Sequence, residues 1–396
     1  MIMKNGLKIQ IEEKIDEIAL YMEKSNSELP SLVEGRTGEI LFWFYYAKYK
    51  DDNKYAEKGM ELLLDLFEKI EKGFNYPAFA GGLAGIGWAI NHLYKHEFIE
   101  ADIDNVLKSI DEYLYPFIMQ SFKEGNYDYL HGALGLSLYY IDRLPNPDAK
   151  VAIEKTVEEL NKLAIRFDNE IAWREKYKDK ISYNLSMSHG IASIITILSF
   201  IVDKKISVEI ASDLLNGAVN FLLGSMKNNI EPYYFPSRIV DGTYSTKGHR
   251  LSWCYNDLGI GMAVYLSGLK TNNTGWKNAG EEILLNTTKI KETNIARTKD
   301  ASLCHGSAGN GHIYNRIFQY TQNDRFIESS EMWIKKTIEY ARYNDGLAGF
   351  KVYSPESYKG MYNDFGFLEG ISGIGLALIS FVSDIVPDWD RILLLS

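Results

Sequence analysis

The chain has 396 residues, 46% of them hydrophobic and 13% aromatic, as in an ordinary, well-packed globular protein. Its net charge of −10 argues against nucleic acid as a partner, because nucleic-acid-binding proteins present a basic face. Two cysteines in so long a chain do not make a disulfide framework, and reduced thiols favour the cytoplasm. Residues 1–11 lack the apolar core of a signal peptide. The longest apolar run, residues 191–202, is shorter than the roughly 20 residues of a membrane span.

A short element, with glycine or a substitute at its first and fourth positions, recurs seven times along the chain. We call it the glycine element and name its first residue position 0. An internal repeat of this kind shares one core, so a single domain over residues 1–396 is predicted in spite of the length. The residues at position 0 are Gly35, Gly82, Gly132, Gly190, Asn256, Gly306 and Gly370.

Amphipathic stretches alternate with apolar ones, and both follow the 3.6-residue period of helices. Amphipathic helices are predicted at residues 8–25, 55–72, 103–122, 151–167, 208–226, 279–293 and 327–343. Helices that are apolar nearly all round, and therefore buried, are predicted at or just after the glycine elements, at residues 39–47, 82–93, 132–140, 190–202, 259–269, 306–320 and 370–382. Strand signals are sparse and confined to stretches such as residues 233–244.

The ends of the repeat predict how the helices are arranged. An open solenoid needs polar capping repeats at both ends, yet the last apolar stretch is as apolar as the middle ones. Closing the row into a ring removes the exposed ends. The fold class predicted is therefore all-α, a seven-fold α/α toroid in which seven inner helices, all pointing one way, are surrounded by seven outer helices. The glycine elements are interpreted as scaffold that lets helices and loops approach closely, since no strands precede them as in a phosphate-binding motif.

The side chains that carry chemistry fall at equivalent positions of the repeat. Two positions before position 0 stand Cys254 and Cys304, and one position before it stand His131, His189 and His305. Asp128 stands four positions before Gly132. Equivalent positions of a ring face one mouth, so we expect the thiols, imidazoles and carboxylate to gather at the ends where the inner helices begin. Those helix ends favour anions such as thiolates.

Cys254, Cys304 and His305 have the composition of a zinc site. Neighbouring helices lie about 8–10 Å apart, so two cysteines at equivalent positions can reach one ion. Three protein ligands leave the fourth tetrahedral position open, which is typical of catalytic zinc. A disulfide, or two buried structural cysteines, is the alternative interpretation.

The remaining site candidates have a functional and a structural interpretation each. His189 is predicted to be a general acid or base; the structural alternative is a core histidine hydrogen-bonded to a backbone carbonyl. Asp128 orients a histidine or relays a proton, against a solvated loop carboxylate. Arg250 orients substrate or supports the zinc ligands, against a surface arginine. His131 has the right position and no obvious partner.

Three long connections, residues 171–183, 233–249 and 350–362, lead to the mouth. They are rich in aromatic and charged residues, and loops on a rigid scaffold commonly carry binding. We expect at least one to contact a substrate, against the alternative of ordinary surface loops.

Arg250-x-x-Trp253-Cys254-Tyr255 followed by Gly259, and Cys304-His305-Gly306, resemble motifs of the lanthionine synthetase C-like family. With the seven glycine elements, the resemblance covers essentially the whole chain and points to the stand-alone cyclases of class I lantibiotic biosynthesis. It implies an α/α toroid with one Zn²⁺ per chain. The residues it matches to zinc ligands are Cys254, Cys304 and His305, and those it matches to catalytic positions are His189, Asp128 and Arg250. Asn256, Leu258 and Ser193 depart from the family pattern and put loop shape in doubt.

The resemblance implies that the protein is a zinc-dependent lanthipeptide cyclase. A peptide cysteine would become a thiolate on the metal and add to a dehydroalanine or dehydrobutyrine of the same peptide, forming a lanthionine or methyllanthionine thioether. The implied partners are a dehydrated precursor peptide, and a dehydratase and an export transporter in a biosynthetic complex. The expected location is the cytoplasm, with membrane attachment only through such a complex. The alternative is a non-catalytic, zinc-containing member of the family that binds glutathione or a protein.

Overall fold

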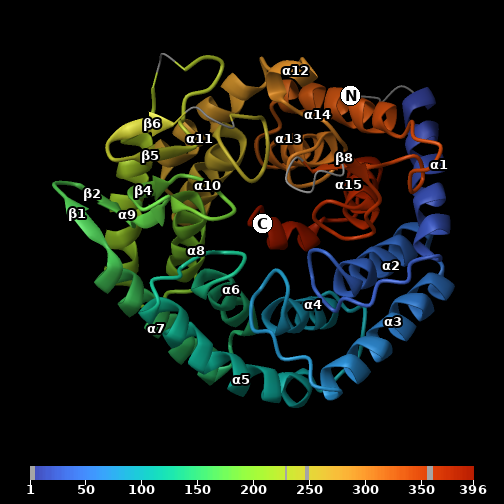
Figure 1. Ribbon diagram of the computed structural model, residues 1–396, viewed down its shortest axis with the longest axis horizontal. Helices are drawn as coiled ribbons and strands as arrows, with labels where there is room; N and C mark the ends of the chain where they lie inside the picture. The colour runs from blue at the N-terminus through green and yellow to red at the C-terminus, as the bar shows by residue number, and fades with distance from the viewer. Residues whose placement is uncertain (1–4, 228–229, 246–248, 355–359) are drawn as a thin grey trace. The chain divides into compact units, whose positions relative to one another are not determined.

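The structure is a computed structural model that describes residues 5–227, 230–245, 249–354 and 360–396 (Figure 1). Parts of two connections predicted to bind substrate, residues 246–248 and 355–359, lie outside the described residues. The chain divides into two compact units. Unit 1 comprises Met1–Tyr76, His92–Glu100 and Lys291–Asp390, and unit 2 comprises Pro77–Asn91, Ala101–Ile290 and Arg391–Ser396.

Unit 1 is mainly helical. Its helices are α1 (Asn5–Met22), α2 (Arg36–Lys50), α3 (Asn53–Glu71), the short α12 (Thr293–Ala296), α13 (Ser307–Thr321), α14 (Asp324–Tyr340) and α15 (Ile371–Val382). One antiparallel hairpin joins β7 (Val352–Ser354) to β8 (Gly360–Tyr362). Helix α4 (Leu83–Lys95) begins in unit 2 and ends in unit 1, and the 3₁₀ helix η1 (Asp388–Leu393) runs from unit 1 into unit 2.

Unit 2 combines helices with two small sheets. Its helices are α5 (Ile103–Lys123), α6 (Ala133–Arg143), α7 (Pro147–Leu163), α8 (Ile191–Asp203), α9 (Val208–Gly224), α10 (Asp257–Lys270) and α11 (Thr274–Thr287). Its strands are β1 (Ile165–Phe167), β2 (Glu170–Ala172), β3 (Glu175–Tyr177), β4 (Lys180–Asn184), β5 (Arg238–Val240) and β6 (Thr243–Ser245). Strands β1 and β2 pair with each other, and the other four form an antiparallel sheet in the order β3-β4-β5-β6.

The alternation of buried and amphipathic helices is confirmed in the described residues. Every residue of α8 from Ile191 to Ile201 is buried, whereas the amphipathic α3 buries only Gly59, Leu63 and Leu66. The buried helices are α2, α4, α6, α8, α10, α13 and α15, and each begins directly after position 0 of its glycine element. The prediction placed the start of α10 two residues late, at Gly259, because it took the glycine for the helix start.

Helix pairing in unit 1 joins the two ends of the chain. Helix α2 packs on α3, and α13 packs on α14. The last buried helix, α15, packs on α1, which precedes every glycine element. Helix α15 also lies between α13 and α2, so the last and the first buried helices are neighbours. This is the arrangement that a closed repeat requires and an open solenoid lacks.

Helix pairing in unit 2 repeats the same unit three times. Helix α6 packs on α7, α8 on α9, and α10 on α11, while α8 lies between α6 and α10. Every pair consists of a buried helix and the amphipathic helix that follows it. The glycine elements of α6, α8 and α10 therefore open neighbouring helices.

The fourth residue of the glycine element permits close contact between a helix and the loop that precedes it. A Cβ atom at Gly309 would lie 1.9 Å from the carbonyl oxygen of Leu303, and one at Gly135 would lie 2.2 Å from that of Tyr129. Real Cβ atoms do not approach that closely, so a side chain would push the loop away. The interpretation of these glycines as scaffold is supported.

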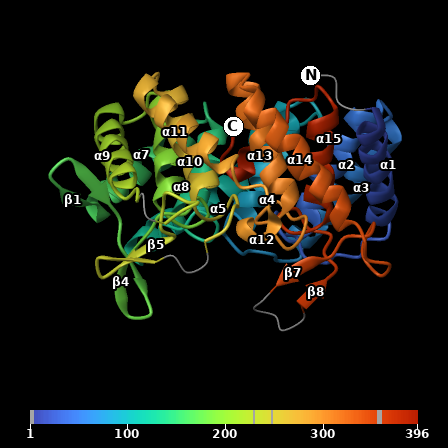
Figure 2. The ribbon, with the colours of Figure 1, turned by 90° about the horizontal axis from the view of Figure 1, so that it is seen from above.

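The sheets in unit 2 correct the sequence prediction. The helix predicted at residues 151–167 ends at Leu163, and its last part is the strand β1. The predicted strand region, residues 233–244, contains β5 and most of β6, but β3 and β4 were missed. Figure 2 shows β4 and β5 beyond the end at which α8 begins. The connection entering α8 is therefore a folded sheet and not an irregular loop.

Candidate metal and acid–base sites

Hydrogen bonds between neighbouring loops hold equivalent positions of the repeat together. In unit 2, the backbone N–H of Ser188 donates to the carbonyl of Cys254 at 3.4 Å. In unit 1, the N–H of Cys304 donates to the carbonyl of Leu368 at 3.1 Å. All four residues stand two positions before their position 0. In unit 2 the loop of His189 therefore lies beside the loop of Cys254. In unit 1 the loop of Cys304 and His305 lies beside the loop of Glu369.

A candidate metal site lies in unit 1. Cys304, His305 and Glu369 each offer one ligand atom, and these atoms all lie within 4.8 Å of one another. The structure thus brings together two of the three predicted zinc ligands. Glu369 was missed, although it stands at the same position before Gly370 that His305 occupies before Gly306. The signal that could have revealed Glu369 is its repeat position, directly before Gly370.

A fully buried carboxylate flanks His305 on its other side. Nε2 of His305 lies 3.4 Å from Oδ2 of Asp300, whose side chain is 0% exposed. Asp300 also accepts hydrogen bonds from the backbone N–H groups of Ser302 and Tyr353. Burial would raise the pKa of Asp300, but His305 and these donors hold it below its ordinary value. Asp300 therefore engages Nε2, which leaves Nδ1 of His305 on the side of Glu369.

These donors fit a zinc ion. Sulfur, imidazole nitrogen and carboxylate oxygen are the three ligand types that zinc takes in proteins. A carboxylate on the far nitrogen of the histidine is also the usual way in which a ligating imidazole is oriented. Cys304, His305 and Glu369 of unit 1 are therefore a donor set that could hold a zinc ion.

Cys254, the third predicted zinc ligand, belongs to unit 2. It is buried, and its thiol donates to Oγ of Ser252 at 3.5 Å. Its carbonyl accepts from Met187 and Ser188, which precede His189 in the loop entering α8. Neither cysteine of the chain is disulfide-bonded.

A carboxylate–imidazole pair in unit 2 joins two of the predicted catalytic residues. Oδ2 of Asp128 lies 2.6 Å from Nδ1 of His189, and the two side chains are 22% and 31% exposed. Burial would lower the pKa of His189, but Asp128, with a smaller contribution from Cys254, raises it above its ordinary value. Burial would raise the pKa of Asp128, but His189 holds it below its ordinary value. The imidazolium form of His189 is therefore favoured, with Nε2 directed away from the carboxylate.

A cavity of about 270 Å³ adjoins this pair. Its lining includes Asp128, His189 and Glu175, which comes from strand β3. Glu175 forms an ion pair with Arg238 of β5, and the Arg238 guanidinium lies 4.5 Å from the ring centre of Tyr177. The sheet that the sequence prediction missed thus supplies a wall of the cavity beside the candidate acid.

Arg250 and His131 are less closely tied to the pair. Arg250 is half-buried and donates its backbone N–H to Oδ1 of Asn256 at 3.3 Å. His131 is exposed, its N–H donates to Asp128, and its ring centre lies 6.2 Å from that of His189.

Asn256, which departs from the family pattern, has a different backbone conformation from the glycine at an equivalent position of the repeat. It has a φ of 68°, whereas Gly132 at the equivalent position has a φ of −135°. Its amide also binds the carbonyl of Phe235 at 3.1 Å. The altered loop shape is thus coupled to the connection that carries β5.

The last residues of the sequence support the loops of unit 2. The hydroxyl of Tyr129, next to Asp128, donates to the carbonyl of Ile392 at 2.7 Å. The indole of Trp253, next to Cys254, donates to the carbonyl of Leu393 at 2.7 Å. The segment that contains Ile392 and Leu393 therefore anchors the residues next to Asp128 and Cys254.

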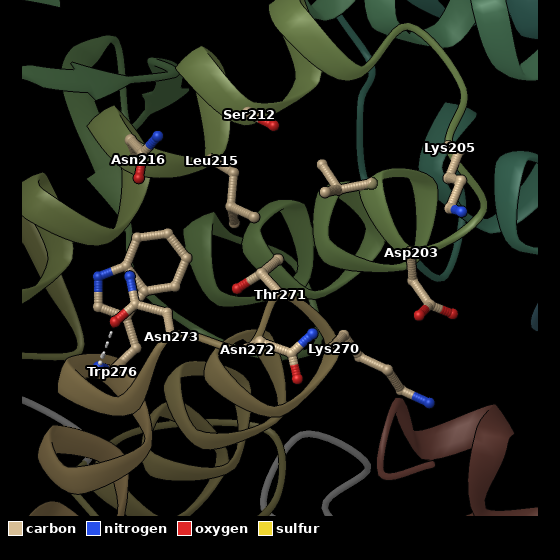
Figure 3. Close-up of a pocket in the computed structure, with 11 residues that line it drawn as sticks. Asp203, Lys205, Ser212, Leu215, Asn216, Lys270, Thr271, Asn272, Asn273 and Trp276 are labelled. Atoms are coloured by element: carbon tan, nitrogen blue, oxygen red, sulfur yellow. Dashed lines mark hydrogen bonds between the residues drawn. The ribbon is translucent and has the colours of Figure 1, made fainter.

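A second cavity in unit 2 lies away from these loops, where α8 and α10 end (Figure 3). It measures about 450 Å³ and is lined by Lys270, Asp203, Trp276 and other polar side chains. Figure 3 shows Lys270 and Asp203 on one side and Trp276 on the other. The described residues that line it include no thiol or imidazole, so it lacks the groups predicted for the zinc and acid–base sites.

Comparison with known proteins places these sites in a family context. The lanthionine synthetase C-like protein family matches residues 27–394. Among solved structures, nisin cyclase is similar at a TM-score of 0.77 and 21% identity, over 99% of this chain and 98% of that one. An unsaturated glucuronyl hydrolase from Streptococcus agalactiae is similar at a TM-score of 0.50 and 15% identity, over 98% of this chain and 95% of that one. No match is found among curated proteins.

Nisin cyclase is an α/α toroid, so its similarity in fold confirms the predicted fold class. The prediction of a single domain stays a prediction. In the described part of the chain, no helix is both long enough and apolar enough to cross a bilayer.

Proposed function

The chain belongs to the lanthionine synthetase C-like family, and from this premise we propose that it is a zinc-dependent lanthipeptide cyclase. The observation that carries the proposal is the grouping of Cys304, His305 and Glu369, whose ligand atoms lie within 4.8 Å of one another. Cys304 and His305 would hold the metal with Cys254, the cysteine at the equivalent position of the preceding repeat. A bound zinc ion would lower the pKa of a peptide thiol, so that it reacts as a thiolate at neutral pH.

The residues of this chain would donate the proton that completes the addition and would orient the bound peptide. The peptide sulfur adds to the β-carbon of a dehydroamino acid, and the electron pair of the double bond moves to the α-carbon and its carbonyl. His189, whose pKa Asp128 raises, would donate its Nε2 proton to the α-carbon, which completes the thioether. Asp128 keeps Nδ1 engaged, so the proton leaves from the nitrogen that faces away from it. Arg250 is proposed to orient the peptide.

The test is ring closure on a synthetic peptide that carries one dehydroalanine and one cysteine. With zinc-loaded protein, the peptide should lose its alkylatable thiol without any change in mass, since addition within one molecule removes no atoms. A sample without protein gives the spontaneous rate. A thiol count that falls no faster with the zinc-loaded protein than without it would sink the proposal.

The same assay separates the cyclase from an enzyme that adds glutathione to dehydroalanine, whereas a non-catalytic, glutathione-binding protein would accelerate neither product. Glutathione added to the reaction competes for the dehydroalanine, and its addition raises the peptide mass by one glutathione. A protein that accelerates only this intermolecular product is not a cyclase. The dehydratase and transporter partners, and the cytoplasmic location, remain predictions from the family.

A further inference from the structure

We propose that Glu369 is an exchangeable ligand of the metal, occupying the coordination position that the substrate thiol takes during the reaction. The inference rests on the proposed function, because it requires the metal site of Cys304 and His305. It adds a residue that the sequence motifs do not contain. Glu369 reaches this place because the carbonyl of Leu368 accepts the N–H of Cys304.

The distances suit a carboxylate ligand. Oε1 of Glu369 lies 3.9 Å from Nδ1 of His305, on the side of the imidazole that faces away from Asp300. Two tetrahedral ligands with bonds of about 2.1 Å to zinc lie about 3.4 Å apart. A movement of about half an ångström would therefore bring both atoms onto one ion. The side chain of Glu369 is 33% exposed, so an incoming thiol can reach the same place from solvent.

Tyr362 gives the carboxylate a second partner. Its hydroxyl donates to Oε2 of Glu369 at 2.6 Å, which leaves Oε1 for the metal. When Oε1 leaves the metal, Tyr362 retains the carboxylate close by.

The β7–β8 hairpin touches both carboxylates that flank His305. Tyr362 of β8 binds Glu369, and the backbone N–H of Tyr353 in β7 binds Asp300 at 2.9 Å. This hairpin forms part of the connection of residues 350–362, one of the three connections of which at least one is predicted to contact substrate. A peptide that contacts the hairpin would therefore act on the exchangeable ligand and on the orientation of His305 together.

The exchange balances. With the three protein ligands of the proposed function, one coordination position would remain, and Glu369 would fill it when no peptide is bound. A peptide thiolate would take that position as the carboxylate oxygen leaves it, and the thiol proton would pass to solvent. One anionic ligand would replace another. Thiolate is the softer ligand and is well suited to zinc, which favours the exchange.

Two variants and one control test the assignment. Glu369→Gln removes the charged ligand, and Tyr362→Phe removes the hydroxyl that retains it. Glu34→Gln is the control, because Glu34 is an exposed glutamate of unit 1 at the same position of the first repeat. Zinc affinity is measured by competition with a chromophoric chelator. Thiol binding is measured by titrating the cobalt-substituted proteins with 2-mercaptoethanol and following the visible absorption.

The variants should shift in opposite directions. Without thiol, Glu369→Gln should bind zinc roughly 10–100-fold more weakly than wild type, the range for losing a group that supports a metal site. Its cobalt spectrum should respond to less thiol, because no carboxylate competes. Tyr362→Phe should keep its zinc and require more thiol, because the carboxylate has lost its second partner. Glu34→Gln should match wild type.

The contrary results are distinct. If wild type binds one zinc and Glu369→Gln matches it in both titrations, Glu369 is no ligand, while the proposed function stands. Equal weakening in Glu34→Gln would show a general effect of charge and also overturn the assignment. A wild type that binds no zinc overturns the assignment and the proposed function together. Circular dichroism checks that each variant is folded.

Discussion

The imidazole of His189 and the carboxylate of Asp128 lie 2.6 Å apart, although 61 residues separate them in the chain. The folded-state pKa of His189 is raised above 6.5, so the pair's contribution to stability is complete below that pH. This contribution is lost as the pH rises through the raised pKa of His189. The pKa of Asp128 is lowered below 3.8, so its contribution is present above that pH and is lost as the pH falls through the lowered value. Both groups are charged between these limits.

Asp128→Asn should lower the pKa of His189, because burial then acts without the opposing charge. Ring closure, if His189 is the acid, should become slower at neutral pH and have its optimum at a lower pH. NMR titration of the His189 ring in the two proteins measures the pKa directly. An unchanged pKa would mean that Asp128 does not hold the proton on His189.

His189→Asn should separate proton transfer from metal binding. The variant should retain zinc and peptide affinity and close rings about 10²–10⁴-fold more slowly, as is typical for loss of a general acid or base. Cys304→Ser, measured beside it, should lose zinc and activity together while keeping its helical circular dichroism. Wild-type rates in zinc-loaded His189→Asn would leave His131 as the next candidate for the acid.

If His305 is a zinc ligand, Asp300→Asn should weaken zinc binding by about 10–100-fold, because the buried carboxylate would then orient the ligating imidazole. The asparagine keeps the shape of the side chain but removes the charge that engages Nε2 of His305. Asp345→Asn is a suitable control, since Asp345 lies in the same unit with its side chain 78% exposed. Equal zinc affinities in the two variants, by chelator competition, would argue against this role.

Gly309→Ala should destabilise the fold by roughly 1–3 kcal/mol, the usual cost of forcing an extra carbon into a packed site. The new Cβ would lie 1.9 Å from the Leu303 carbonyl, in the loop that carries Cys304. Gly6→Ala is the control, because a Cβ at Gly6 meets nothing within 4 Å. Denaturant unfolding of both variants gives the two free energies. A Gly309→Ala variant as stable as the control would show that the loop can move aside.

The helices could be predicted because each combines two signals. Apolar periodicity located α8, and Gly190 marked its start to within one residue. The positions of His189 and Cys304 could also be predicted, because the backbone bonds adjacent loops at equivalent positions of the repeat. The two repeat positions directly before the glycine element therefore carried more information than any single motif.

The strands β3 and β4 could not be predicted in the same way. Strands of three to five residues contain too little alternation to show a period of two. The hairpin of β5 and β6 has Asp241-Gly242 at its turn, with positive φ at both residues, which is a strong hairpin signal. The turn between β3 and β4 uses Lys178 and Asp179, also at positive φ, and has no glycine to reveal it. Tertiary pairing with β5 stabilises β4 in place of local sequence.

The hydrogen bonds from Tyr129 to Ile392 and from Trp253 to Leu393 span 263 and 140 residues of the chain. During synthesis, the loops that carry Asp128 and Cys254 are made long before the segment that ties them down. Until residues 392 and 393 have been added, the two loops lack these hydrogen bonds, however completely α6, α8 and α10 have already packed. The nascent chain can thus pack these helices before the loops that carry Asp128 and Cys254 gain their last backbone partners.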